Sequence, residues 1–176
     1  MTDQYEKKEY FVPQKRPNSG CIPLCYEILL RAANIQGIDY QTFQDEFDFD
    51  KYLQNGKSGK NNFDTVRKAI MNKYPHITLE SKKFLLGQGK DKLKFVEQYI
   101  EERPRILVSI WVQPSKPSER IEFHIMPVLG STDDNLVLLR AVNDNREPIT
   151  QDISKSDFVH NHDNGKDGCD VAFLDM

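Results

Sequence analysis

An apolar run at residues 105–112, RILVSIWV, is the feature that most constrains how this chain can fold. Pro104 precedes the run, Pro114 follows it, and its β-branched and aromatic residues favour a strand. A short apolar segment bounded by prolines predicts a strand buried in the centre of a sheet. Before this run, apolar residues recur mostly at helical spacing, and after it, short β-prone segments alternate with turns. Helices followed by strands predict an α+β fold.

The same periodicity predicts where the individual elements lie. One helix is expected to begin close to Pro23 and to end by Gly37. Further helical segments are expected at residues 39–47, 62–74, 91–103 and, as a single turn, 154–159. Further strands are expected at residues 76–80, 122–129, 136–142, 149–153 and 170–174. With 176 residues, of which 38% are hydrophobic, the chain suits one domain over residues 1–176, in which residues 1–10 are expected to be flexible.

Composition argues against several classes of function. The formal net charge of −3 is unlike that of a dedicated nucleic-acid-binding domain, which is usually basic. No apolar stretch approaches the roughly 18 residues that predict a membrane span. The opening residues, MTDQYEKKEYF, lack the apolar core of a signal peptide. We therefore expect a cytoplasmic protein with neither a nucleic acid nor a membrane as its partner.

The cysteines favour neither a disulfide framework nor a metal site. There are three of them, Cys21, Cys25 and Cys169, and an odd number without a signal peptide does not suggest a set of disulfides. The spacing of Cys169 from His160 and His162 matches no zinc pattern. No metal and no cofactor is expected.

Cys21 is the cysteine with the clearest chemical potential. The turn residues 18–20, NSG, lead into it, and a helix is predicted directly after it, which places the thiol at a helix N-terminus. The helix dipole there favours the thiolate, which is the reactive form of cysteine. Gln14, upstream of the turn, has an amide that could donate to an oxyanion. Cys25 lies one helical turn further on and is expected to be a packing residue.

His124 is the candidate base. A lone histidine within an apolar strand is more often a core residue, but here Cys21 precedes it and a polar cluster, residues 143–145, follows the next predicted strand. If the two strands are antiparallel neighbours, the end of the second returns to the start of the first, where His124 lies. A carboxylate or carboxamide there could accept a hydrogen bond from the imidazole and select its tautomer. Adjacent strand positions face opposite ways, so only one of Asp144 and Asn143 can serve, and we favour Asp144.

The order of these residues resembles that of the papain-like cysteine peptidases. The likeness is nearest to the branch that is similar to the bacteriocin-processing peptidases, which cut after double-glycine leaders. It is carried by residues 12–14 (VPQ), 19–23 (SGCIP), 26–30 (YEILL), 124–130 (HIMPVLG), 142–144 (VND), 153–158 (ISKSDF) and 171–174 (VAFL).

The resemblance implies a fold in which the nucleophile helix of an N-terminal helical half packs on a C-terminal antiparallel sheet. It also implies Cys21 as the nucleophile, His124 as base and acid, and Gln14 as a donor in the oxyanion hole. Asp144, or alternatively Asn143, would complete the triad. The expected function is hydrolysis of a peptide or amide bond in a peptide or protein substrate. Two alternatives stay open: an inactive binding or accessory domain of the same fold, and a transglutaminase-like acyl transferase.

Overall fold

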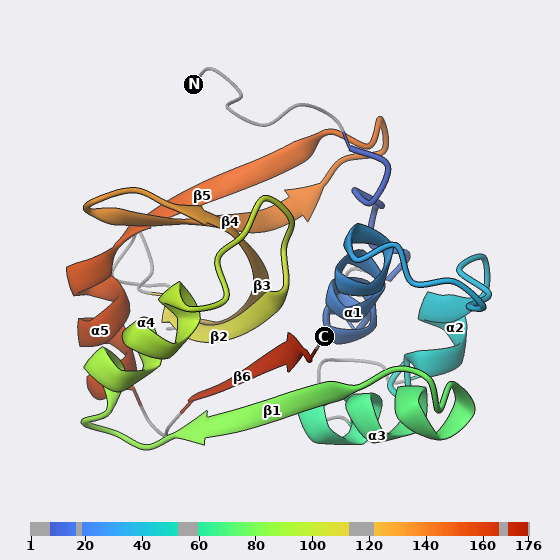
Figure 1. The fold of residues 1–176 in the computed structure, drawn as a ribbon, viewed down its shortest axis with the longest axis horizontal. Helices are drawn as coiled ribbons and strands as arrows, with labels where there is room; N and C mark the ends of the chain where they lie inside the picture. The colour runs from blue at the N-terminus through green and yellow to red at the C-terminus, as the bar shows by residue number, and fades with distance from the viewer. Residues whose placement is uncertain (1–7, 17–18, 53–59, 113–121, 166–168, 176) are drawn as a thin grey trace.

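A computed structural model of the chain describes residues 8–16, 19–52, 60–112, 122–165 and 169–175 (Figure 1). Within these residues, five helices and one six-stranded antiparallel sheet form an α+β fold. The helices are α1 (Cys21–Ala32), α2 (Phe43–Phe47), α3 (Phe63–Lys73), α4 (Gly89–Glu97) and α5 (Lys155–Asp163). The strands are β1 (Leu79–Phe84), β2 (Ile106–Val112), β3 (Glu122–Ser131), β4 (Asn135–Val142), β5 (Pro148–Ser154) and β6 (Cys169–Leu174), in the order β1-β6-β2-β3-β4-β5. Residues 1–7, in the segment expected to be flexible, lie outside the described residues.

Strand β2 is the central strand that the apolar run predicted. It pairs with β3 along one edge and with β6 along the other. Leu107 packs into the core on one face of the sheet, whereas Ile106 and Val108 pack into the core on the other face. Because both faces are covered, the strand reads as a continuous apolar run rather than as an alternation.

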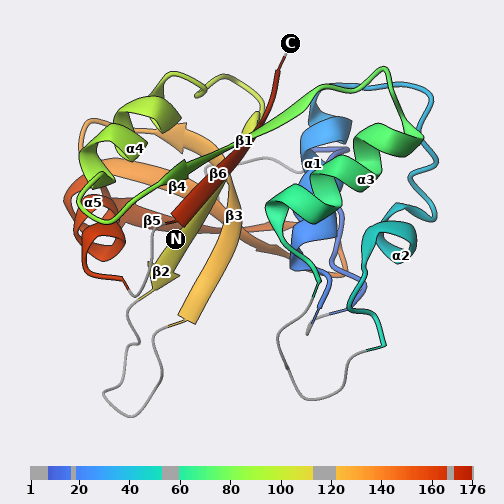
Figure 2. The same cartoon turned by 90° about the horizontal axis from the view of Figure 1, so that it is seen from below.

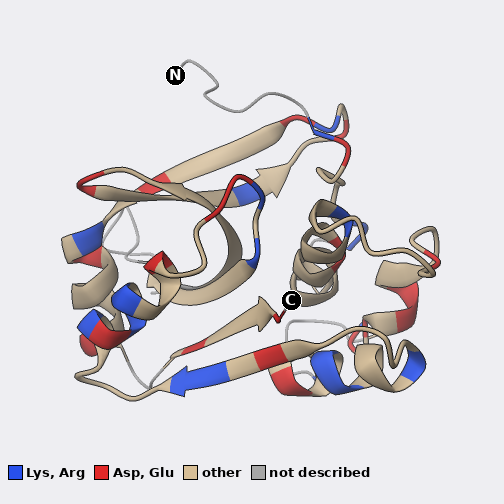
Figure 3. Cartoon of the chain, viewed as in Figure 1, with Lys and Arg blue, Asp and Glu red and all other residues tan. Residues whose placement is uncertain are grey.

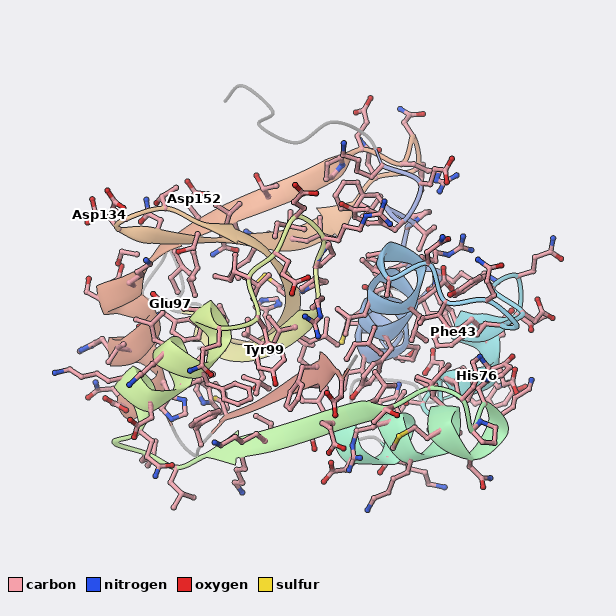
Figure 4. All side chains as sticks on the ribbon, viewed as in Figure 1. Phe43, His76, Glu97, Tyr99, Asp134 and Asp152 are labelled. Atoms are coloured by element: carbon pink, nitrogen blue, oxygen red, sulfur yellow. The ribbon has the colours of Figure 1, made fainter. Side chains whose placement is uncertain are left out.

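Helix α1 lies between the sheet and the helices α2 and α3 (Figures 1 and 2). Ten of its twelve residues are buried, which agrees with a helix that is apolar on nearly all sides. Tyr26 packs with Phe43 of α2, which is labelled in Figure 4, and Leu24 packs with Leu139 of β4 on the other side. Burial of a side chain such as Phe43 contributes about 2–3 kcal/mol, so these contacts hold α1 tightly in place.

Helices α4 and α5 cover the face of the sheet away from α1 (Figures 1 and 2). Val96 of α4 and Phe158 of α5 pack there against Val108 and Val171. In Figure 3 charged residues lie on the outer helices, in loops and along β1, whereas β2 is uncharged. None of the described helices combines the length and the apolar character that crossing a membrane requires.

Two predicted helices are shorter than expected. Helix α2 starts only at Phe43, because the carboxylate of Asp39 accepts a hydrogen bond from the backbone N–H of Gln41 and forms a turn that competes with the helix. Helix α4 ends at Glu97 rather than near residue 103. The ring of Tyr99, which is labelled in Figure 4, lies with its centroid 4.7 Å from that of Phe173.

One predicted strand is displaced along the chain, and one predicted helical turn is a longer helix. The strand expected at residues 76–80 is β1, which begins at Leu79, where it pairs with Leu174 of β6. The expected single turn after β5 is the longer helix α5. Its N-cap is Ser154, whose hydroxyl accepts a hydrogen bond from the backbone N–H of Asp157. The first half of the chain therefore contributes an edge strand to the sheet as well as helices.

Candidate active site

Cys21 is the first residue of α1. Gly20 is the N-cap, and its carbonyl accepts the helical hydrogen bond from the N–H of Leu24 at 3.1 Å. Cys21 is exposed, whereas Cys25 and Cys169 are buried. The thiol of Cys25 donates to the carbonyl oxygen of Ile125 at 3.6 Å, in agreement with the packing role expected for it. Cys21 is therefore the cysteine that faces solvent from a helix N-terminus.

One pocket brings together Gln14, Cys21 and His124, which come from three separate segments of the chain. It has a volume of about 280 Å³ and lies between the first turns of α1 and the strands β3 and β4. Its other walls are formed by Leu24, Cys25, Ile28, Ile125, Pro127, Leu139, Arg140, Ala141 and Val142. The nucleophile, the base and the oxyanion donor that the resemblance implies thus share a single cavity.

The pairing of β3 with β2 determines where His124 lies. His124 is opposite Ile110 in that pair and is half-buried. The next residue, Ile125, receives the hydrogen bond from Cys25, one turn along α1 from Cys21. The strand that carries the histidine therefore passes directly beside the helix that carries the cysteine.

The residues expected to complete the triad lie in the turn after β4. Asn143 closes this turn: its side-chain oxygen accepts from the N–H of Asn145 at 3.0 Å and from the N–H of Glu147 at 2.9 Å. Its amide donates to the carboxylate of Glu147 at 3.1 Å. Asp144 is exposed, and neither Asp144 nor Asn143 is among the described residues that line the pocket, although Val142 is. The role of Asp144 as the third member stays a prediction, and Asn143 is engaged in its own turn.

A single carbonyl group joins Gln14 to the turn before Cys21. The carbonyl oxygen of Arg16 accepts from the Gln14 side-chain amide at 2.5 Å, from Gly20 N–H at 3.0 Å and from Ser19 N–H at 3.4 Å. A Cβ atom at position 20 would lie 3.1 Å from this oxygen and 3.6 Å from Cγ of Gln14. Glycine at position 20 therefore permits the close approach of Gln14 to the turn that leads into Cys21.

Helix α2 holds the segment on both sides of Gln14. The side chain of Gln44 is buried; it donates to the carbonyl oxygen of Pro13 at 3.1 Å and accepts from the N–H of Lys15 at 2.9 Å. Asp45, the next residue in α2, forms ion pairs with Lys15 at 3.2 Å and with Arg16. Nothing in the sequence marks Gln44, because one glutamine in an amphipathic segment has no pattern that identifies its partners.

Asp48, at the C-terminal cap of α2, holds the other end of the same loop. Its carboxylate is fully buried and accepts from the Ser19 hydroxyl at 2.8 Å and from the Asn61 amide at 2.8 Å. Arg16 Nη1 lies 3.6 Å from it, and the Asn61 amide also donates to the carbonyl oxygen of Ser19 at 2.8 Å. Gln44 and Asp48 together fasten the loop that carries Gln14 and leads into Cys21.

The surroundings of Cys21 raise the pKa of its thiol above the ordinary value of 9.0. Part of the residue reaches the surface, but protein atoms crowd the sulfur, and this burial is the largest cause of the rise. The backbone N–H groups of Ile22 and Cys21 lower the pKa, and the negative charge of Asp48 raises it further. The N–H groups at the helix N-terminus act in the direction expected from the sequence, but the loss of hydration outweighs them, so that the net pKa rises. This shift favours the thiol form of Cys21 over the thiolate.

His160 and His162 lie in α5, on the face of the sheet away from α1 (Figure 1). His162 is buried, its Nε2–H donates to the carbonyl oxygen of Leu85 at 2.8 Å, and burial lowers its pKa. Among the residues that the structure describes, no group of three or more His, Cys, Asp or Glu side chains is placed to hold a metal ion.

Comparison with known proteins finds no family model that matches the chain and no match among the curated proteins. The residues of the pocket therefore carry the functional inference.

Proposed function

We propose that this protein is a papain-like cysteine hydrolase that cleaves a peptide or amide bond, with Cys21 as nucleophile and His124 as base and acid. The observation that supports this most directly is the single pocket lined by Gln14, Cys21 and His124. A helix start at the cysteine and an antiparallel strand that carries the histidine beside that helix agree with the papain-like arrangement.

The first step forms an acyl-enzyme. In this scheme His124 takes the proton of the Cys21 thiol as the sulfur attacks the carbonyl carbon of the substrate. A C–S bond forms, and the carbonyl oxygen becomes an oxyanion. The imidazolium of His124 then gives the proton to the leaving nitrogen as the C–N bond breaks. The result is a thioester at Cys21 and a free amine.

Two donors serve the oxyanion in this scheme. One is the backbone N–H of Cys21, which has no helical partner at the first position of α1. The other is the Gln14 amide, which has two hydrogens and uses one on the carbonyl oxygen of Arg16. A well-placed donor contributes roughly 3–4 kcal/mol to such a transition state.

Water completes the cycle. His124 accepts a proton from the water that attacks the thioester, and the C–S bond breaks to release an acid and the thiol of Cys21. The carboxylate of Asp144 would orient the imidazole in both steps by accepting a hydrogen bond from its other nitrogen.

The proposal is tested by measuring how fast iodoacetamide alkylates Cys21, with mass-spectrometric mapping of each cysteine. The rate on the native protein is compared with the rate on His124→Gln and on the urea-unfolded chain at the same pH. We expect His124→Gln to slow alkylation of Cys21 at least several-fold. The buried Cys25 and Cys169 should react slowly in both folded proteins and thus report that each remains folded.

Turnover is then followed on a mixture of peptides of defined sequence, with Cys21→Ser as the inactive control. Cleavage products identify a hydrolase, whereas transfer of the acyl group to an added primary amine in preference to water identifies an acyl transferase. If Cys21 reacts at the same rate with and without His124, and no product forms, the enzymatic proposal is overturned in favour of a binding domain of the same fold.

A further inference from the structure

The pocket carries one side chain with a permanent charge. Among the described residues that line it, Arg140 of β4 is alone in being always charged, and the walls on either side of Cys21 are mostly apolar. Arg140 is exposed, and no ion pair or hydrogen bond links its guanidinium to the residues that the structure describes. The guanidinium is therefore available to a ligand in the pocket that holds Cys21.

An irregularity in β4 accompanies this placement. Leu139 pairs with Thr150 of β5 and Ala141 pairs with Ile149, so that Arg140 is an extra residue in β4, a β-bulge. Four consecutive residues, 139–142, line the pocket, whereas a regular strand presents alternate residues to one face. Bulges commonly redirect a side chain beside a functional site. Here the bulge accounts for a charged residue and its apolar neighbours lying along the same wall.

We propose that Arg140 binds a carboxylate of the substrate, and that the enzyme therefore prefers an acidic group close to the bond it cleaves. A guanidinium presents a planar set of donors that matches a carboxylate, and the apolar wall strengthens the pair by excluding water. This inference rests on the proposed function, because it assigns part of the substrate of the same site. The carboxylate can belong to an acidic side chain or to the C-terminus of a peptide.

Three alkylating probes of nearly equal size separate these sources. N-iodoacetyl-glutamic acid α-amide carries a side-chain carboxylate, N-iodoacetyl-glutamine carries a main-chain carboxylate, and N-iodoacetyl-glutaminamide is neutral. In each reaction the sulfur of Cys21 forms a C–S bond, iodide leaves, and the thiol proton passes to the base. The quantity compared is the alkylation rate of Cys21 by each acidic probe divided by its rate with the neutral probe.

For at least one acidic probe, we expect this rate ratio in the native protein to be about 3- to 10-fold higher than the same ratio measured with free N-acetylcysteine. Arg140→Gln should abolish this preference, and Arg140→Glu should reverse it. Each acidic-probe rate is divided by the neutral-probe rate of the same variant, so a change in the reactivity of Cys21 itself cancels from the comparison. High salt should reduce the preference in the native protein, because the pair is partly exposed. The acidic probe that is preferred identifies the source of the carboxylate.

Lys90→Gln is the matched control. Lys90 is exposed on α4, which lies across the sheet from α1 (Figures 1 and 2), and its loss removes one positive charge without touching the pocket. If Lys90→Gln lowers the preference as much as Arg140→Gln does, or if Arg140→Gln changes nothing, the Arg140 subsite is overturned. The neutral probe has no carboxylate, so its rate reports the reactivity of Cys21 independently of Arg140. If the proposed function fails, His124→Gln will leave the neutral-probe rate unchanged.

Discussion

Gln44 binds the main chain on both sides of Gln14. Its amide donates to the carbonyl oxygen of Pro13 and its oxygen accepts from the N–H of Lys15, so the backbone of Gln14 is held at two adjacent points. Because Gln44 is buried in α2, which packs against α1, the candidate oxyanion donor is positioned relative to the helix that carries Cys21.

Replacement of Gln44 by alanine should therefore impair catalysis more than substrate binding. We expect Gln44→Ala to lower kcat about 10- to 100-fold with little change in KM, because the Gln14 amide loses its exact position. It should also lower the free energy of unfolding by about 1–3 kcal/mol, since two partly buried backbone groups lose their partner. Gln41→Ala, an exposed change in the turn before α2, is the control and should alter neither quantity. Equal losses in both variants would contradict the positioning role.

Asp48 links stability to the reactivity of Cys21. Asp48→Asn should lower the free energy of unfolding by about 2–4 kcal/mol, because the buried carboxylate accepts from Ser19 and Asn61 and a neutral amide would satisfy these donors poorly. Urea unfolding measures this loss.

The same substitution should lower the pKa of the Cys21 thiol. The negative charge of Asp48 disfavours the thiolate, so its removal favours ionisation. The pH dependence of alkylation by iodoacetamide measures the change, and the rise in rate should move to lower pH. A rise at unchanged or higher pH would show that Asp48 does not act on the thiol through its charge.

The two candidates for the third triad member have different expected effects. If Asp144 orients His124, Asp144→Asn should lower kcat on the order of 100- to 10,000-fold and leave the fold intact, because the residue is exposed. Asn143→Ala should instead weaken the turn that Asn143 closes, with a small loss of stability and a much smaller change in kcat. Kinetics and thermal unfolding of both variants decide the assignment, and the opposite ranking of kcat would transfer the role to Asn143.

Lys92 should make stability depend on alkaline pH. It is fully buried in α4, and its ammonium donates to the carbonyl oxygen of Ser109 at 2.5 Å and lies 4.9 Å from the ring centre of Phe158. Burial lowers its pKa from 10.5 to about 8. Below pH 8 the lysine is protonated in the folded and the unfolded chain, so the cost of burying the charge is fully present. Between about pH 8 and 10.5 the unfolded chain binds more protons, so this contribution to the unfolding free energy rises with pH.

Comparison with Lys92→Met isolates this effect from other groups that titrate in the same range. The unfolding free energy of the native protein minus that of Lys92→Met should rise by up to about 3 kcal/mol between pH 7 and 10.5. Lys90→Met, an exposed change in the same helix, should show no such rise. A flat difference for Lys92→Met would mean that the buried lysine keeps an ordinary pKa.

The local pattern of the sequence was sufficient for much of the fold. The apolar run at 105–112 predicted a central strand and is β2, and the periodicity after Cys21 predicted the helix that is α1. These predictions succeed because the spacing of apolar residues and the presence of proline, glycine and capping residues act within a few residues of chain. Predictions of element ends were less accurate where distant contacts decide them, as for β1, whose start is determined by pairing with β6.

For the candidate site too, some features follow from the sequence and others depend on the tertiary structure. Residue types and their order sufficed to single out Gln14, Cys21 and His124, because a thiol at a helix start, an imidazole and an amide donor have recognisable chemistry. Only the tertiary structure brought them to one pocket, identified Gln44 and Asp48 as the residues that hold the loop, and placed Arg140 in the wall. Only the packing around the sulfur decided that the pKa of Cys21 rises. These properties depend on burial and on partners far apart in the chain, and neither is encoded in the identity or spacing of neighbouring residues.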